Sequence, residues 1–143
     1  MRMIRAARSY DAVAIADLCG ELGYPATCQQ VRVRLAAIEA ADAAVLVAEN
    51  AAGEVVGWLH VGRCARLLGD AQAEIFGLVV ASDARGSGVG HDLIGRAGQW
   101  ARERGCDSVR VRSHVERDRA RHFYLREGFA AHKTQHVLER ALD

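Results

Sequence analysis

The chain has 143 residues, of which 50% are hydrophobic and 26% are charged, and its net charge at pH 7 is +1. This composition is typical of a soluble globular protein and excludes a disordered or collagen-like chain. The small net charge gives no reason to expect a nucleic-acid or membrane partner. The length suits one domain, so we expect a single domain over residues 1–143.

The cysteines and the first residues bear on the cellular compartment. Cys19, Cys28, Cys64 and Cys106 show neither metal-ligand nor redox spacing, so we expect free thiols and no metal. The opening MRMIRAARSYD lacks the apolar run of a signal peptide, and no stretch approaches the roughly 20 apolar residues of a membrane span. These features favour a cytoplasmic protein.

The first quarter of the chain predicts one strand and two helices. Residues 3–6 read as a short strand, after which Ser9 can cap a helix that ends at Gly23. Thr27 starts a second helix, and Gln30 three residues later completes a capping box.

The middle of the chain predicts three strands. Residues 44–48 and 55–61 form a hairpin around the turn residues 50–53, and residues 63–70 are expected to be a loop. Residues 73–80 form the next strand, in which Gly77 indicates a bulge or a close approach by another group.

The last third alternates helices and strands. A helix opens at residues 86–90 and closes at Gly105, a strand covers 108–112, a helix covers 117–127, and 129–138 is the last extended segment. The order β-α-α-β-β-β-α-β-α-β predicts an α/β fold with a mixed sheet and helices on both faces.

Three glycines at alternate positions follow the strand at 73–80, namely Gly86, Gly88 and Gly90. Glycine has no Cβ, so the backbone N–H groups can come close to a ligand. The first turn of the following helix adds unpaired N–H donors and a partial positive charge. With Arg85 as a cation, the turn is a candidate pyrophosphate site.

Two other phosphate-binding motifs fit this turn poorly. A Walker A loop ends in Gly-Lys-Ser/Thr, whereas His91 and Asp92 follow here. A dinucleotide loop follows the first strand of its fold, whereas this turn follows the fourth predicted strand. The remaining alternative is a turn that only reverses the chain, which the density of glycines and the adjacent arginine disfavour.

The turn resembles a known signature. Arg85-Gly86-Ser87-Gly88-Val89-Gly90 is similar to the R/Q-x-x-G-x-G/A motif of the GNAT superfamily of N-acetyltransferases, whose small bacterial members have one domain. The resemblance implies that this turn binds the pyrophosphate of coenzyme A. It also implies that the strand residues Leu78, Val79 and Val80 pair with the pantetheine arm as an added strand.

A second motif lies downstream. Residues 113–129 resemble the family pattern S-N-x-x-R-x-x-A-x-x-F-Y-x-x-x-G-F, and the matching residues are Arg117, Ala120, Phe123, Tyr124, Gly128 and Phe129. The resemblance implies that Arg117 and His114 bind the cofactor. His114 stands where the family usually has Asn, so it either replaces the amide as a hydrogen-bonding group or adds a titrating group to the site.

Amine acetylation requires a base for the ammonium, a donor to the oxyanion and an acid for the leaving thiolate. The resemblance points to Tyr124 as the acid. Glu74 is the expected base, because a carboxylate is unusual among its apolar neighbours on the strand. His60 on the partner strand, or water, is the alternative base. Backbone N–H groups of residues 78–80 are the expected oxyanion donors.

The resemblance implies an acetyl-CoA-dependent N-acetyltransferase that acts on a primary amine of a small molecule or protein, in a ternary complex and without a metal. The alternative is a non-catalytic acetyl-CoA-binding or sensing module of the same fold. A nucleic-acid-binding module is disfavoured, because the basic run at residues 110–121 lacks interleaved aromatics and Arg110 and Arg112 suit a solvated strand face. A homodimer is expected from the resemblance alone.

Overall fold

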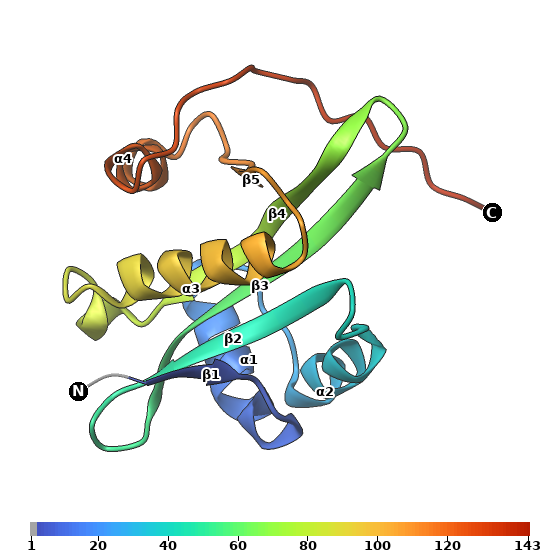
Figure 1. The fold of residues 1–143 in the computed structure, drawn as a ribbon. Coiled ribbons are helices and arrows are strands. Elements are labelled where there is room, and N and C mark those ends of the chain that lie inside the picture. The colour runs from blue at the N-terminus through green and yellow to red at the C-terminus, as the bar shows by residue number, and fades with distance from the viewer. Residues whose placement is uncertain (1–2) are drawn as a thin grey trace. The chain divides into compact units, whose positions relative to one another are not determined.

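A computed structural model describes residues 3–143, and its contacts divide the chain into two compact units (Figure 1). One unit ends at Arg112, and the other covers Ser113–Asp143. The first unit carries the sheet and its helices. The second carries one α-helix and an irregular tail.

The first unit is built around one mixed five-stranded sheet. The strands run in the spatial order β1-β2-β3-β4-β5, with antiparallel neighbours except for the parallel pair β4 and β5. This confirms the predicted fold class. The elements are β1 (Met3–Ala6), α1 (Ala12–Leu22), α2 (Cys28–Ala37), β2 (Ala43–Glu49), β3 (Val55–Arg66), β4 (Gly69–Val80), α3 (Val89–Glu103) and β5 (Val109–Val111), with 3-10 turns at Ser9–Asp11 and Ser82–Ala84.

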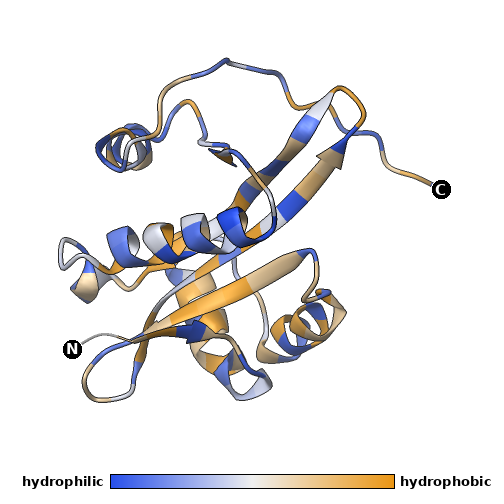
Figure 2. Cartoon of the chain, in the orientation of Figure 1, coloured by the Kyte–Doolittle hydropathy of each residue, from blue (hydrophilic) through white to orange (hydrophobic). Residues whose placement is uncertain are grey.

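Helices cover both faces of this sheet, as predicted. On one face Val47 of β2 packs with Ala12 and Ile15 of α1 and with Val31 of α2. On the other face α3 lies so close to β3 that a Cβ added to Gly57 would stand 3.0 Å from a Val89 methyl carbon. Figure 2 shows the matching hydropathy, with β2 mostly hydrophobic and many hydrophilic residues on the visible side of α3.

Local hydrogen bonds explain where the first two helices begin. Thr27 Oγ1 accepts from the Gln30 N–H, and Gln30 Oε1 accepts from the Thr27 N–H, each at 3.0 Å, so the predicted capping box is present. The prediction that Ser9 caps the first helix is wrong. Asp11 provides the polar contact instead, because its carboxylate accepts from the Arg8 N–H at 2.7 Å.

Asp11 is only 3% exposed and accepts two hydrogen bonds from the Arg5 guanidinium, at 2.8 Å each. The hydrogen bonds from Arg5 lower the pKa of Asp11, and the Arg8 N–H adds to this effect, while burial opposes it. The ionised carboxylate therefore stabilises the fold above its unfolded pKa of about 3.9, and this contribution disappears as the pH falls through the lower folded pKa.

Asp11→Asn is expected to destabilise the protein by about 3 kcal/mol at pH 7, because it breaks a buried ion pair. The deficit should be constant above pH 5 and shrink below pH 4, where the wild-type carboxylate also becomes protonated. Urea unfolding at pH 7 and pH 3 measures both values. Asp17→Asn, on an exposed position of α1, is the control and should change little. An equal deficit at both pH values would contradict this account.

The predicted loop at residues 63–70 is wrong. β3 and β4 continue as a hairpin as far as the pair Arg66 and Gly69, so only Leu67 and Leu68 form the turn. The apolar pattern ends near Val61, but backbone pairing needs no apolar side chains and carries the two strands further.

The second unit begins before α4 (Asp118–Arg126), which ends in a Schellman motif. Gly128 has φ 93°, the Phe129 N–H donates to the Tyr124 carbonyl at 3.0 Å, and the Gly128 N–H donates to the Leu125 carbonyl at 3.2 Å. The predicted last strand at 129–138 does not form. The segment is irregular and mostly exposed, and a strand without a paired neighbour is not stable.

Candidate active site

The glycine turn lies between β4 and α3. Gly86 has φ 78° and Gly88, the N-cap of α3, has φ 92°, so both occupy the left-handed region that favours glycine. The Asp92 N–H donates to the Gly88 carbonyl at 3.0 Å, and the N–H groups of Val89 and Gly90 stand before this bond at the start of the helix. A hollow of about 310 Å³ adjoins the turn, and Ser87 and Val89 line it.

The end of β4 is an open strand edge within the sheet. β5 pairs with β4 only at Ala73–Ile75, so residues 76–80 have β3 on one side and no strand of the sheet on the other. The Ala81 N–H donates to β3 at the Val56 carbonyl, and by alternation the N–H and C=O groups of Leu78 and Val80 face the open edge. A hydrogen bond from Arg85 supports this orientation, because Arg85 Nε donates to the Val80 carbonyl at 3.3 Å and the carbonyl is therefore not paired with β3.

A β-bulge on β4 separates this edge from Glu74. His60 pairs with Gly77 and Val61 pairs with Ile75, so Phe76 is one residue in excess. A Cβ on Gly77 would stand 2.8 Å from the Trp58 ring. Both predictions for Gly77, a bulge and a close approach, are therefore confirmed.

Glu74 is partly buried, with a side chain 16% exposed, and its carboxylate forms an ion pair with Arg112. Arg112, the residue directly after β5, donates from Nε to Glu74 Oε2 on β4 at 3.1 Å. The Arg112 side chain is 55% exposed, which agrees with the predicted solvated face, and its ion pair with Glu74 adds a role that the prediction did not include. The two opposite charges are visible in the sequence, but their pairing depends on the register of β4 and β5.

Rings of three residues gather on the same side of the sheet as Glu74. The ring centroids of His60 and Phe76 lie 5.0 Å apart, and Trp58 covers Gly77. Burial lowers the pKa of His60, so its imidazole is neutral at pH 7 and can accept a proton. The Trp58 indole Nε1 is buried and has no hydrogen-bond partner within residues 3–143, a feature that the sequence did not indicate.

Tyr124 lies on α4 of the second unit. Its ring contacts those of Phe123 and Phe129 edge to face, with centroids 5.2 and 5.5 Å away. Burial raises the pKa of the Tyr124 phenol, so the group keeps its proton throughout the neutral range. The Schellman motif explains why the family pattern has Gly and Phe after this tyrosine, since both fix the turn that holds the ring.

His114 and Arg117 lie in the segment before α4. His114 Nδ1 accepts a hydrogen bond from the Glu116 N–H at 3.3 Å, and its carbonyl accepts from the Arg117 N–H at 3.0 Å. Asparagine makes the same side-chain bond to the N–H two residues on, in an Asx turn. The bond supports a structural replacement of Asn by His.

Neither a metal centre nor a membrane span is found within residues 3–143. Residues 3–143 contain no group of three or more His, Cys, Asp or Glu that could hold a metal ion. None of the helices in that range is long and apolar enough to cross a membrane. All four cysteines are free thiols.

The chain belongs to the acetyltransferase (GNAT) family, whose model matches residues 12–129. Members of this family transfer acetyl groups to amines and generally use acetyl-CoA. No curated protein sequence matches the chain significantly.

Solved structures agree with this fold. A transcriptional regulator from Bacillus halodurans has 25% identity and a TM-score of 0.84, with 98% of this chain and 100% of that chain covered. A Trypanosoma brucei acetyltransferase has 24% identity and a TM-score of 0.81, with the same coverage. An aminoglycoside 6'-N-acetyltransferase from Acinetobacter baumannii has 14% identity and a TM-score of 0.88, with both chains covered completely.

Proposed function

We propose that the protein is an acetyl-CoA-dependent N-acetyltransferase in which a primary amine attacks the thioester directly in a ternary complex. The observation that carries the proposal is the junction of β4 and α3. There an open strand edge leads into a turn with two positive-φ glycines at a helix N-terminus. An amide-containing arm attached to a pyrophosphate is a ligand that needs both features.

The residues present fit coenzyme A. Residues 85–90 would hold the pyrophosphate through backbone N–H groups and the Arg85 cation, and residues 78–80 would pair with pantetheine. His114 and Arg117 are proposed to add contacts from the second unit. The family model spans parts of both units, which supports the proposal of one domain over 1–143. When bound, acetyl-CoA supplies the activated acetyl group.

Different groups of the chain are proposed to act as oxyanion donor, general acid and general base. The N–H groups of Leu78 or Val80 at the open edge are proposed to stabilise the oxyanion, and Tyr124 to donate a proton to the departing sulfur. Glu74 is the proposed base. It has one carboxylate oxygen engaged by Arg112, so the other must take the proton, directly or through water.

His60 is the competing base, because its buried imidazole is neutral at pH 7. If it acts, the rate should fall as the pH drops through its pKa, which is below 6.5. Glu74→Gln and His60→Gln separate the two roles, since only the variant of the base loses turnover and keeps acetyl-CoA affinity.

The charged groups around Glu74 favour one class of acceptor amine over another. A polycation such as an aminoglycoside is recognised by several carboxylates, whereas Glu74 is paired with Arg112 and lies opposite Arg110 in the ladder. We therefore favour a monoamine on a small molecule or a protein over a polycation. The cytoplasmic location and the homodimer remain predictions, and sedimentation analysis tests the second.

A thiol-release assay with acetyl-CoA and a panel of monoamines, polyamines and peptide N-termini tests the function. We expect turnover that depends on both substrates and is highest with a monoamine. Tight acetyl-CoA binding without turnover on any amine would instead support the alternative, a non-catalytic sensing module. The similarity to a transcriptional regulator, at 25% identity, is the observation that favours this second candidate.

A further inference from the structure

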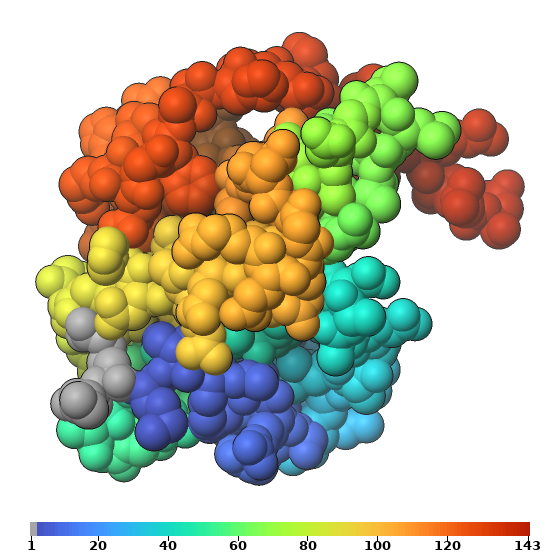
Figure 3. All heavy atoms as spheres, viewed as in Figure 1, coloured from blue at the N-terminus to red at the C-terminus, as the bar shows by residue number. Residues whose placement is uncertain are grey.

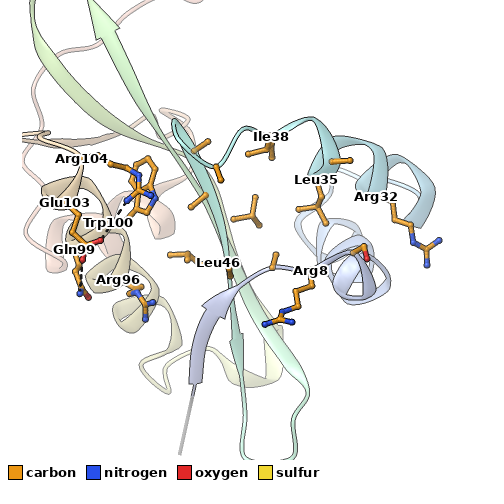
Figure 4. Close-up of a pocket in the computed structure, with 18 residues that line it drawn as sticks. Arg8, Arg32, Leu35, Ile38, Leu46, Arg96, Gln99, Trp100, Glu103 and Arg104 are labelled. Atoms are coloured by element: carbon orange, nitrogen blue, oxygen red, sulfur yellow. Dashed lines mark hydrogen bonds and ion pairs between the residues drawn. The ribbon is translucent and has the colours of Figure 1, made fainter.

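A separate groove of about 540 Å³ lies at the opposite edge of the sheet, beside β1 and β2 (Figure 4). Leu35, Val45 and Trp100 form part of its apolar lining, and none of its lining residues belongs to β4 or to the glycine turn. Arg96, in the groove, is seven residues along α3 from Val89, which is roughly 10 Å. In Figure 3 the N-terminal segment, α2 and the end of α3 (blue, cyan and orange) meet on this side.

The groove exists because β1 is shorter than β2. The ladder between them ends at Ala6 and Leu46, and the Ala7 N–H makes one further bond to the Val45 carbonyl at 2.8 Å. The chain then turns away towards α1. The outer edge of β2 at residues 43–44 is thus not covered by β1. The Ala43 N–H already donates to the Glu39 carbonyl at 3.0 Å and Ala44 faces β3 by alternation, so this edge offers the Ala43 carbonyl to another segment and not a full ladder.

The charge of the groove is strongly one-sided. Four arginines line it, against one acidic residue, although the net charge of the whole chain is only +1. That acidic residue, Glu103, is already engaged, since it accepts from Gln99 at 3.3 Å and lies 3.9 Å from Arg104. The other three arginines, Arg8, Arg32 and Arg96, form no ion pair within residues 3–143.

These arginines come from different elements on the two sides of the sheet edge. Figure 4 shows Arg96 on α3, Arg32 on α2 and Arg8 on the segment after β1, between them. Arg104 also lies on the α3 side, where its guanidinium stacks on Trp100 at 4.5 Å. Anionic groups are therefore favoured on both sides of one open strand edge.

We propose that this groove binds an extended acidic peptide segment of a partner protein. Successive side chains of an extended strand point to opposite faces, so one peptide can direct carboxylates to Arg32 on one side and to Arg96 on the other. A compact small anion would reach only one side. Because the backbone at residues 43–44 offers little beyond the Ala43 carbonyl, carboxylate–guanidinium bonds supply most of the recognition.

The probe is a fluorescein-labelled octapeptide of sequence Glu-Asp-Glu-Leu-Glu-Val-Asp-Glu, and binding is measured by fluorescence anisotropy. Arg32→Gln and Arg96→Gln should each weaken it about tenfold, as expected for one lost charge-assisted hydrogen bond. Arg34→Gln and Arg102→Gln are matched controls, since they lie on the same helices outside the groove and should change affinity less than twofold. Raising the salt from 50 to 500 mM should weaken binding further.

Several results would overturn the proposal: no binding of the peptide, equal loss in the control variants, or displacement by glutarate as effective as that by unlabelled peptide, which would indicate a small-anion site. A concentration-dependent dimer that Arg32→Gln or Arg96→Gln dissociates would assign the groove to a second copy of the chain. Unchanged melting temperatures of all four variants, with acetyl-CoA stabilisation intact, would show that any loss is local and independent of the proposed transferase function.

Discussion

Gly88→Trp is expected to abolish the thermal stabilisation of this protein by acetyl-CoA. Gly88 is the N-cap of α3 at φ 92°, directly before the first turn of the helix. A large side chain there is expected to block the approach of the pyrophosphate that we propose binds at this turn. The left-handed backbone also costs a non-glycine residue about 1–2 kcal/mol, so the variant should melt roughly 3–6 °C below the wild type.

The measurement is a melting curve with and without acetyl-CoA. At 100 times its Kd, a ligand that binds only the folded state adds about 2.7 kcal/mol, or roughly 8–10 °C for a chain of this size. Gly105→Trp is the matched control. Gly105 follows the other end of α3 at φ 75° with open space around it, so it suffers the same backbone strain away from the turn. The control should keep the whole ligand shift; its loss in both variants would attribute the effect to unfolding.

Local chemistry made much of the first unit predictable. The capping box at Thr27 and Gln30 needs only two residues at fixed spacing, and both of its hydrogen bonds are present. Gly77 is another case, since a glycine inside a strand has few physical reasons other than a bulge or a close neighbour. The glycine turn is predictable for the same reason, because positive φ at Gly86 and Gly88 favours glycine.

Features that depend on pairing between distant residues were harder to predict. The extension of β3 to Arg66 rests on backbone ladder bonds that need no apolar pattern. The ion pair of Glu74 and Arg112 depends on the register of β4 and β5, which the sequence does not encode locally. The wrong prediction of a strand at 129–138 also comes from pairing between distant residues, because a segment becomes a strand only if a partner strand lies beside it.

The Schellman motif of α4 connects a sequence pattern to the proposed chemistry. The hydrogen bonds of Gly128 and Phe129 bring the Phe129 ring against Tyr124, which restrains the phenol. The hydroxyl itself makes no hydrogen bond within the second unit, so its proton is available to a ligand. The Tyr124 ring therefore packs in the unit while its hydroxyl can donate a proton. Removing the hydroxyl alone separates the structural role from the proposed catalytic one.

Tyr124→Phe is expected to lower kcat about 100-fold and to leave the acetyl-CoA Kd and the melting temperature unchanged. A general acid contributes 10²–10⁴ to a rate. Phenylalanine keeps both edge-to-face ring contacts, so stability is preserved. Because burial raises the pKa of Tyr124 above its usual value of 10, the wild-type enzyme should show no alkaline loss of kcat below pH 10 that is due to this group.

The measurement is steady-state thiol release by both proteins over pH 6–9.5, with the best amine of the panel. Tyr10→Phe removes the same hydroxyl from an exposed ring elsewhere and should keep wild-type kcat. If Tyr124 only fills the core of its unit, Tyr124→Phe will turn over like the wild type, whereas Tyr124→Ala will melt lower. The thiolate would then leave with a proton from water, and the transferase would depend on the base and the oxyanion donors alone.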